Sequence, residues 1–186
     1  MGKIKGMAII MVLVLLAGCS AGSKSDKEEA ETASFDEIIT AIKEQIATDL
    51  KDGGVEEEVL VDGKLMNYME TDLTASEESD PAVAIWIEKM GLNNEEIAKG
   101  KVIAAMMNVN ADEIILLEAK DEKQVASLKR ALEKELEGQV QTWKQYLPDQ
   151  YEKVEKNVIK TKGKYLLYVT YTQPEKIENV FDSSFN

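Results

Sequence analysis

The sequence contains no histidine, a single cysteine (Cys19) and three prolines in 186 residues. Without histidine, the chain has neither the usual general base near neutral pH nor the commonest ligand for transition metals. A lone cysteine cannot form an intramolecular disulfide, so the folded part must be held by its core alone. The sequence also has no cofactor fingerprint, and we expect neither a resident cofactor nor a metal.

The single cysteine lies at the end of a short apolar segment. Lys3 and Lys5 precede the ten apolar residues 7–16, and the small residues Ala17 and Gly18 stand directly before Cys19. A helix needs about 20 apolar residues to cross the ~30 Å hydrocarbon core, so this segment is too short to span a bilayer. The pattern is typical of a lipobox and predicts cleavage between Gly18 and Cys19. The alternative is an ordinary secretory signal with an incidental cysteine.

This interpretation divides the chain into a lipoprotein signal peptide at 1–18, a lipidated cysteine with a tether at 19–33, and one folded domain at 34–186. Residues 20–33 contain no large apolar side chain and are expected to form a flexible linker. A diacylglycerol on Cys19 supplies two acyl chains, which hold a protein stably at a bilayer. We therefore expect a protein anchored at the cell membrane on its extracytoplasmic face.

Acidic residues outnumber basic ones by 35 to 22, which gives a net charge of −13. Nucleic acid and anionic lipid surfaces would both repel such a chain, so neither is an expected partner. Cationic peptides, divalent ions and neutral ligands remain compatible with this charge.

Two helices are predicted in the first half of the chain. Ser34 and Glu37 have the spacing of a capping box, and an apolar stripe follows from residue 35 to residue 50. Asp80 and Pro81 predict the start of a second helix, which should end at Gly91. Residues 55–80 give no clear pattern beyond a short strand and a turn of helix.

The second half of the chain predicts two β-hairpins separated by a long amphipathic helix. The first hairpin joins strands 102–109 and 113–119, and the second joins 158–161 and 165–171. Between them, an apolar stripe with helical spacing runs from residue 125 to residue 147, where Pro148 should stop the helix. A capping box at residues 172–175 predicts a last helix.

This order predicts an α+β fold in which the two hairpins form an antiparallel sheet and helices pack on one face. The strand order does not follow from the pattern. Several segments also resemble a known family: residues 90–92, 111–114, 143–150 and 162–165 are similar to a family of small bacterial lipoproteins, mostly from Gram-positive anaerobes. That family is known only as a domain of unknown function. The resemblance covers about residues 90–182 and implies the anchor and a compact α+β domain, with no functional residue to carry over.

Acidic side chains are the only abundant reactive groups. Asp112 and Glu113 are candidates for carboxylate chemistry, although Asp112 is equally explained as a turn residue and Glu113 as an exposed strand start. Asn108, Asn110 and Asp112 match three positions of an EF-hand loop, but Glu113 replaces its glycine and Ala119 its bidentate carboxylate. Acidic runs at 56–62 and 77–80 leave a weaker calcium site conceivable.

Aromatic residues concentrate in the last third of the chain. Of these, Tyr146, Tyr151 and Tyr168 are the candidates for binding a sugar or peptide, against the alternative that they pack beneath a helix. Two functions from different classes follow. The preferred one is a non-enzymatic module that binds a protein or another envelope component. The alternatives are a carboxylate-based envelope hydrolase and a weak calcium-binding surface protein.

Overall fold

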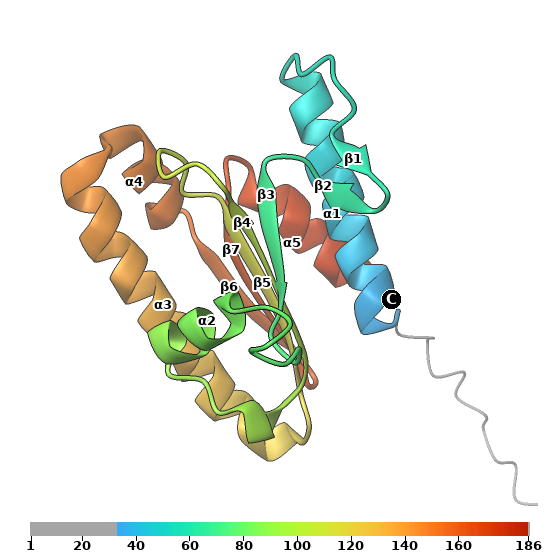
Figure 1. Cartoon of the computed structure of the whole chain (residues 1–186), viewed down its shortest axis with the longest axis vertical. Helices are drawn as coiled ribbons and strands as arrows, with labels where there is room; N and C mark the ends of the chain where they lie inside the picture. The colour runs from blue at the N-terminus through green and yellow to red at the C-terminus, as the bar shows by residue number, and fades with distance from the viewer. Residues whose placement is uncertain (1–32, 186) are drawn as a thin grey trace, which may run out of the picture.

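The computed structural model describes residues 33–185, which form a sheet between two layers of helices (Figure 1). On one face lie α1 (Phe35–Asp52) and α5 (Pro174–Ser183). On the other lie α2 (Ala82–Met90) and α3 (Val125–Tyr146), and α4 (Pro148–Glu155) follows α3 directly. Single 3-10 turns at Asn94–Glu96 and Glu122–Gln124 precede β4 and α3.

The main sheet has five antiparallel strands in the order β3-β4-β5-β7-β6. A separate two-stranded sheet pairs β1 with β2. The strands are β1 (Leu60–Val61), β2 (Lys64–Leu65), β3 (Tyr68–Asp72), β4 (Ile97–Ala105), β5 (Glu113–Ala119), β6 (Val158–Lys162) and β7 (Tyr165–Thr170). The predicted α+β class, both hairpins and the helix between them are confirmed.

Helices cover both faces of the sheet, whereas the sequence predicted one. The reason lies in β5, where residues 114–117 are consecutive apolar residues. Successive strand side chains point to opposite faces. Ile114 and Leu116 therefore pack with α1 and α5, while Ile115 and Leu117 pack with α2 and α3. A strand that is apolar on both sides needs a helical layer on each.

The predicted start of α1 is confirmed, since Ser34 and Glu37 form both hydrogen bonds of a capping box. The end of α3 was only half predicted. Pro148 stops α3 as expected, but it also begins α4, because a proline is well tolerated in the first turn of a helix. The last helix lacks its predicted capping box, and Gln173 makes no side-chain cap hydrogen bond there.

Residues 55–80 hold an element that the sequence did not reveal. Residues 68–72 form β3, an edge strand paired with β4 from Tyr68 opposite Ala105 to Asp72 opposite Lys101. With this partner, β4 begins at Ile97 and ends at Ala105, shifted towards the N-terminus from the predicted 102–109. Residues 106–112 therefore form a loop at the end of the sheet.

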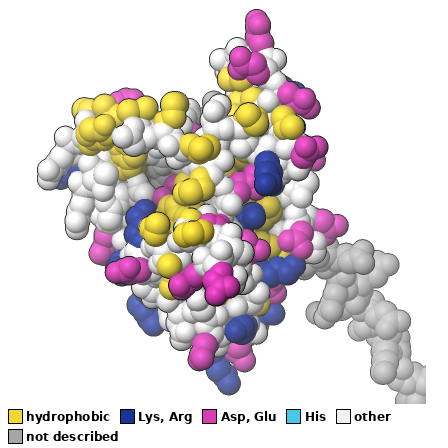
Figure 2. Space-filling model, in the orientation of Figure 1, with side chains coloured by type: hydrophobic (Ala, Val, Ile, Leu, Met, Phe, Trp, Pro, Cys, Tyr) yellow, Lys and Arg dark blue, Asp and Glu magenta, His cyan; other side chains and the backbone are white. Residues whose placement is uncertain are grey.

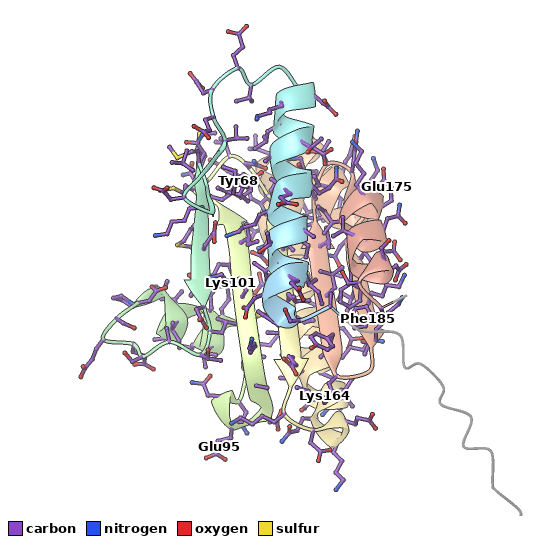
Figure 3. The ribbon with its side chains drawn as sticks, turned by 90° about the vertical axis from the view of Figure 1, so that its right-hand side faces the viewer. Tyr68, Glu95, Lys101, Lys164, Glu175 and Phe185 are labelled. Atoms are coloured by element: carbon purple, nitrogen blue, oxygen red, sulfur yellow. The ribbon has the colours of Figure 1, made fainter. Side chains whose placement is uncertain are left out.

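The two ends of the described part meet at the opposite end of the sheet. The backbone N–H of Ala33 donates to the carbonyl of Ser184 at 2.9 Å. Figure 3 shows the face of the sheet that α1 and α5 cover. Tyr68 lies towards its upper end, and Phe185 and Lys164 lie towards its lower end. Among residues 33–185, no helix combines the length and apolarity required to cross a membrane.

Candidate functional site

Four exposed methionines gather around the β4–β5 loop. Met106 and Met107 lie in this loop, and Met66 and Met69 lie at the neighbouring end of β3. Their side chains are between 40% and 70% exposed. Met66 and Met107 line one shared hollow, and Met69 lies beside Met106 and Met107 in another, so the four form one surface. We call these four residues the methionine patch.

The patch continues onto the helices of the same face. Figure 2 shows hydrophobic side chains gathered over this end of the molecule, with Asp and Glu side chains scattered around them. Ile85 of α2 and Tyr146 of α3 are further exposed apolar side chains on these helices. Unbranched methionine side chains adapt to irregular partners, and contiguous exposed apolar patches are typical of binding surfaces.

A hollow of about 280 Å³ lies between the patch and the helices. Its lining combines methionine and tryptophan side chains with polar groups from β5 and α3. The principal lining residues are Met69, Met106, Glu113, Gln139, Trp86 and Trp143. The lining of the hollow thus brings apolar side chains and acidic groups together.

Two buried carboxyl groups meet beside this hollow. Glu113 of β5 and Glu135 of α3 have side chains that are only 5% and 1% exposed. The amide nitrogen of Gln139 donates to both at 2.9 Å. The ammonium of Lys89 lies 2.5 Å from Glu135 Oε1 and 3.7 Å from Glu113 Oε2. Lys89 also lies over the ring of Trp86, 4.5 Å from its centroid.

Burial and the neighbouring charge of Glu135 raise the pKa of Glu113 to about 8, although Lys89 partly opposes the shift. At neutral pH the pair therefore retains one proton, and the remaining negative charge is balanced by Lys89. Within residues 33–185, Glu113 Oε1 and Glu135 Oε2 are buried without a hydrogen-bond partner. The site thus offers more acceptor capacity than Lys89 and Gln139 use.

The adjacent Asp112 belongs to a different buried cluster. Its Oδ2 accepts from the Tyr68 hydroxyl at 2.9 Å and from Asn110 Nδ2 at 3.1 Å, and its Oδ1 accepts from Lys153 at 2.7 Å. Burial, followed by the charge of Asp112, raises the pKa of Tyr68 well above its usual range. These bonds hold the β4–β5 loop in shape. They also occupy both carboxylate oxygens of Asp112, one of the three residues that matched the EF-hand loop.

The three predicted tyrosines do not form a site together. Tyr168 is fully buried beneath α3, so its proposed place in a surface binding site was wrong. β7 is central and apolar on both faces, which is why this side chain points into the core. Tyr151 is half-buried against Trp143, and Tyr146 is exposed near the same indole, with ring centroids 5.9 Å apart.

The expectation for Glu113 as an exposed strand start was also wrong, since this residue is buried. Asp112 keeps its turn role, because its backbone N–H donates to Asn110 Oδ1, but it is buried as well. No group of three or more acidic side chains in residues 33–185 is arranged to hold a metal ion. Gly18 and Cys19 lie outside the described residues.

Sequence reasoning missed the partners Lys89, Glu135 and Trp86. Glu135 carried a usable signal, since it lies three residues after Leu132 and four after Ala131 on the buried face of α3. A charged residue at such a position indicates a buried ion pair. No comparable signal marked Lys89, because only the tertiary packing of α2 places it.

The domain has an α+β fold, in which helices cover both faces of an antiparallel sheet. A hollow lined in part by methionines lies at one end of this sheet. A family model described as domain of unknown function DUF4358 matches residues 71–171, from β3 to just after β7. The chain belongs to this family. Neither the search of curated proteins nor that of solved structures gave a match. The matched segment contains the carboxyl pair and Lys89, while α1 and α5 lie outside it.

Proposed function

We propose that this protein is a lipid-anchored binding protein on the extracytoplasmic face of the cell membrane, which holds a basic protein of the envelope through the methionine patch. The observation that carries this proposal is the patch itself. Four exposed methionines form this surface, and three of them line a hollow at a sheet end that Asp112 and Lys153 hold in shape. A soluble domain rarely exposes such a surface without a partner.

The anchoring half of the proposal rests on the sequence. Two lysines, ten apolar residues and a small-residue pair lead directly to the only cysteine. Acylation of Cys19 would anchor the chain in the membrane, and the folded domain would be attached to this anchor at residue 33. The β4–β5 loop, which carries Met106 and Met107, lies at the other end of the sheet from residue 33, so a tethered domain presents it away from its attachment point (Figure 1).

The charge of the chain indicates the character of the partner. With a net charge of −13, the protein repels anionic lipid headgroups and attracts basic proteins. Apolar contact with the methionines supplies affinity, and complementary charge supplies orientation and speed of association. A partner that is apolar at the centre of its interface and basic around it fits both features.

The two alternative functions gain less support. In a glycosidase, the substrate lies between two carboxyl groups that are about 5–9 Å apart. Here the amide nitrogen of Gln139 donates to both Glu113 and Glu135 at 2.9 Å, so one buried amide occupies the space in which a glycosidase places the bond to be cleaved. For a calcium-binding protein, the acidic runs at 56–58 and 77–78 consist of exposed side chains, as solvated loops do.

The proposal can be tested by site-specific photocrosslinking of the full-length lipidated protein in its native membrane. A photoreactive residue at Met107 should capture a basic protein, and Met106→Glu should abolish that capture. The matched control is a photoreactive residue at Asn179, which is exposed on α5. Equal capture from both positions, or capture that survives Met106→Glu, would contradict the proposal.

A further inference from the structure

The carboxyl pair already holds an ammonium group. Lys89 places its nitrogen between Glu135, Glu113 and the ring of Trp86. An ammonium ion held by a carboxyl pair that carries one negative charge, and by an indole face, has both of the interactions that aromatic cages use for cations. The protein therefore contains a binding site for an ammonium group, and in this structure the site is occupied by the chain's own Lys89.

Lys89 is held less firmly than the two glutamates that bind its ammonium group. Both glutamates are buried, Glu113 on the central strand β5 and Glu135 inside the 22-residue helix α3, whereas the Lys89 side chain is 40% exposed near the end of the nine-residue helix α2. Its side chain can turn outward into water without unfolding α2. Exchanging its ammonium for that of a ligand leaves the charge of the buried site unchanged, which avoids the cost of burying an additional charge.

Two further observations indicate an external ligand. Glu113 lines the 280 Å³ hollow, and Glu113 Oε1 and Glu135 Oε2 accept no hydrogen bond from residues 33–185. A lysine side chain entering the hollow would run its apolar stem along Met69 and Trp143 and bring its ammonium group to Glu113, the member of the carboxyl pair that lines the hollow. The hollow thus matches a lysine side chain in both its apolar and its charged part.

We propose that the Glu113–Glu135 pair binds a lysine side chain of the partner polypeptide, which enters through the methionine-rimmed hollow and displaces Lys89. This inference rests on the proposed function for the nature of the partner. It adds the chemical group that is recognised, and it makes Lys89 an internal competitor that is released when the partner docks.

The two tryptophans of the chain, Trp86 and Trp143, both line the hollow and serve as reporters. Trp143 Nε1–H donates to Gln139 Oε1, while the amide nitrogen of Gln139 contacts both carboxyl groups. The two indole N–H signals of an NMR spectrum therefore follow occupancy of the site. The probes are the peptide acetyl-Gly-Lys-Gly-amide, the same peptide with norleucine in place of lysine, and methylammonium chloride, all at constant ionic strength.

The lysine peptide should shift both indole signals saturably, and the norleucine peptide should not. Lys89→Met removes the competitor and should tighten binding by about tenfold or more. Glu135→Gln should weaken it by a similar factor. Lys99→Met is the matched control, because Lys99 also pairs with a carboxylate (Asp36) beside an aromatic ring (Phe35) but lies on the surface away from the hollow. The Lys99→Met protein should bind the lysine peptide with the same affinity as the wild type.

Shifts that are absent in Lys89→Met, or equal in Lys89→Met and Lys99→Met, would overturn the proposal. Should Lys89→Met lose the dispersed spectrum of a folded protein, Lys89→Gln, which keeps a donor for Glu135, replaces it. Methylammonium binding as tightly as the peptide would identify a free amine as the ligand and contradict the polypeptide source. Loss of crosslinking in Met106→Glu together with unchanged peptide binding in Glu135→Gln would refute this inference alone and leave the proposed function standing.

Discussion

Lys153 of α4 lies 2.7 Å from the buried Oδ1 of Asp112, and thereby ties α4 to the loop that carries Met106 and Met107. The other carboxylate oxygen accepts from Tyr68 of β3. One carboxylate thus joins three parts of the chain that are more than 40 residues apart. The shape of the methionine patch depends on this junction.

Replacing Lys153 by methionine should lower the free energy of unfolding by about 2–4 kcal/mol, because removing one partner leaves a largely buried carboxylate uncompensated. Urea unfolding at neutral pH measures the change. Lys156→Met, at an exposed position at the end of the same helix, is the control and should stay within about 0.5 kcal/mol of the wild type. Equal effects of the two substitutions would refute the role of the Lys153–Asp112 contact.

Glu113 predicts a pH dependence of stability. Its pKa is raised from 4.5 to about 8 in the folded protein by burial, followed by the charge of Glu135. Between these two values the folded protein keeps a proton that the unfolded chain has released. The free energy of unfolding should therefore decrease as the pH rises from about 4.5 to 8, with a slope of at most about 1.4 kcal/mol per pH unit. The stabilisation is complete below the lower value and lost above the upper one.

The measurement is urea unfolding at several pH values for the wild type and for Glu113→Gln. The glutamine is neutral at every pH, so the difference in stability between the two proteins should change across this window and become constant above it. A difference that is independent of pH would show that Glu113 is ionised in the folded protein.

Two glycines should respond in opposite directions to alanine. A Cβ at Gly100 would lie 3.0 Å from Leu73 Cβ and 3.2 Å from Leu117 Cδ2, both in the core. Gly100→Ala should therefore destabilise the fold by about 1–3 kcal/mol through overpacking. Gly138, inside α3, has open space around it, and Gly138→Ala should stabilise by about 0.5–1 kcal/mol. Thermal unfolding of both variants checks this pair, and a stabilising Gly100→Ala would contradict the close packing of Leu73 and Leu117 around Gly100.

Cys19→Ala tests the anchor. Without the thiol, no diacylglycerol can be attached, and the protein should leave the membrane fraction and no longer incorporate radiolabelled palmitate. Cys19 is the only cysteine, so no second thiol can take its place. Lys24→Ala, in the same segment, should have no effect on either measurement. Continued membrane fractionation of Cys19→Ala without label would point to an uncleaved signal or a protein partner as the anchor.

Local patterns predicted most of the fold because the elements concerned carry their own signals. Ser34 with Glu37 forms the capping box that its spacing indicated. In contrast, β3 has only five residues with a weak alternation, and its existence depends on pairing with β4. Such a strand is specified by its partner, which a local pattern does not contain.

The candidate site was less predictable for a related reason. Glu113 looked like an exposed strand start because charged residues are rarely buried. Its burial depends on Glu135, 22 positions later, and on Lys89, 24 positions earlier, and the three meet only when α2 and α3 pack on the sheet. The sequence shows these three charged residues, but it does not show that Lys89 balances the charge of the two glutamates.

The hydrogen bond between Ala33 and Ser184 has a mechanical consequence. A pulling force applied through residue 33 is passed first to this bond and to the layer formed by α1 and α5. The β4–β5 loop lies at the far end of the sheet and bears little of that load, so drag on a tethered domain would leave the methionine patch undistorted. For the same reason, a label attached at Ser184 would lie beside Ala33 and leave the opposite end of the sheet free.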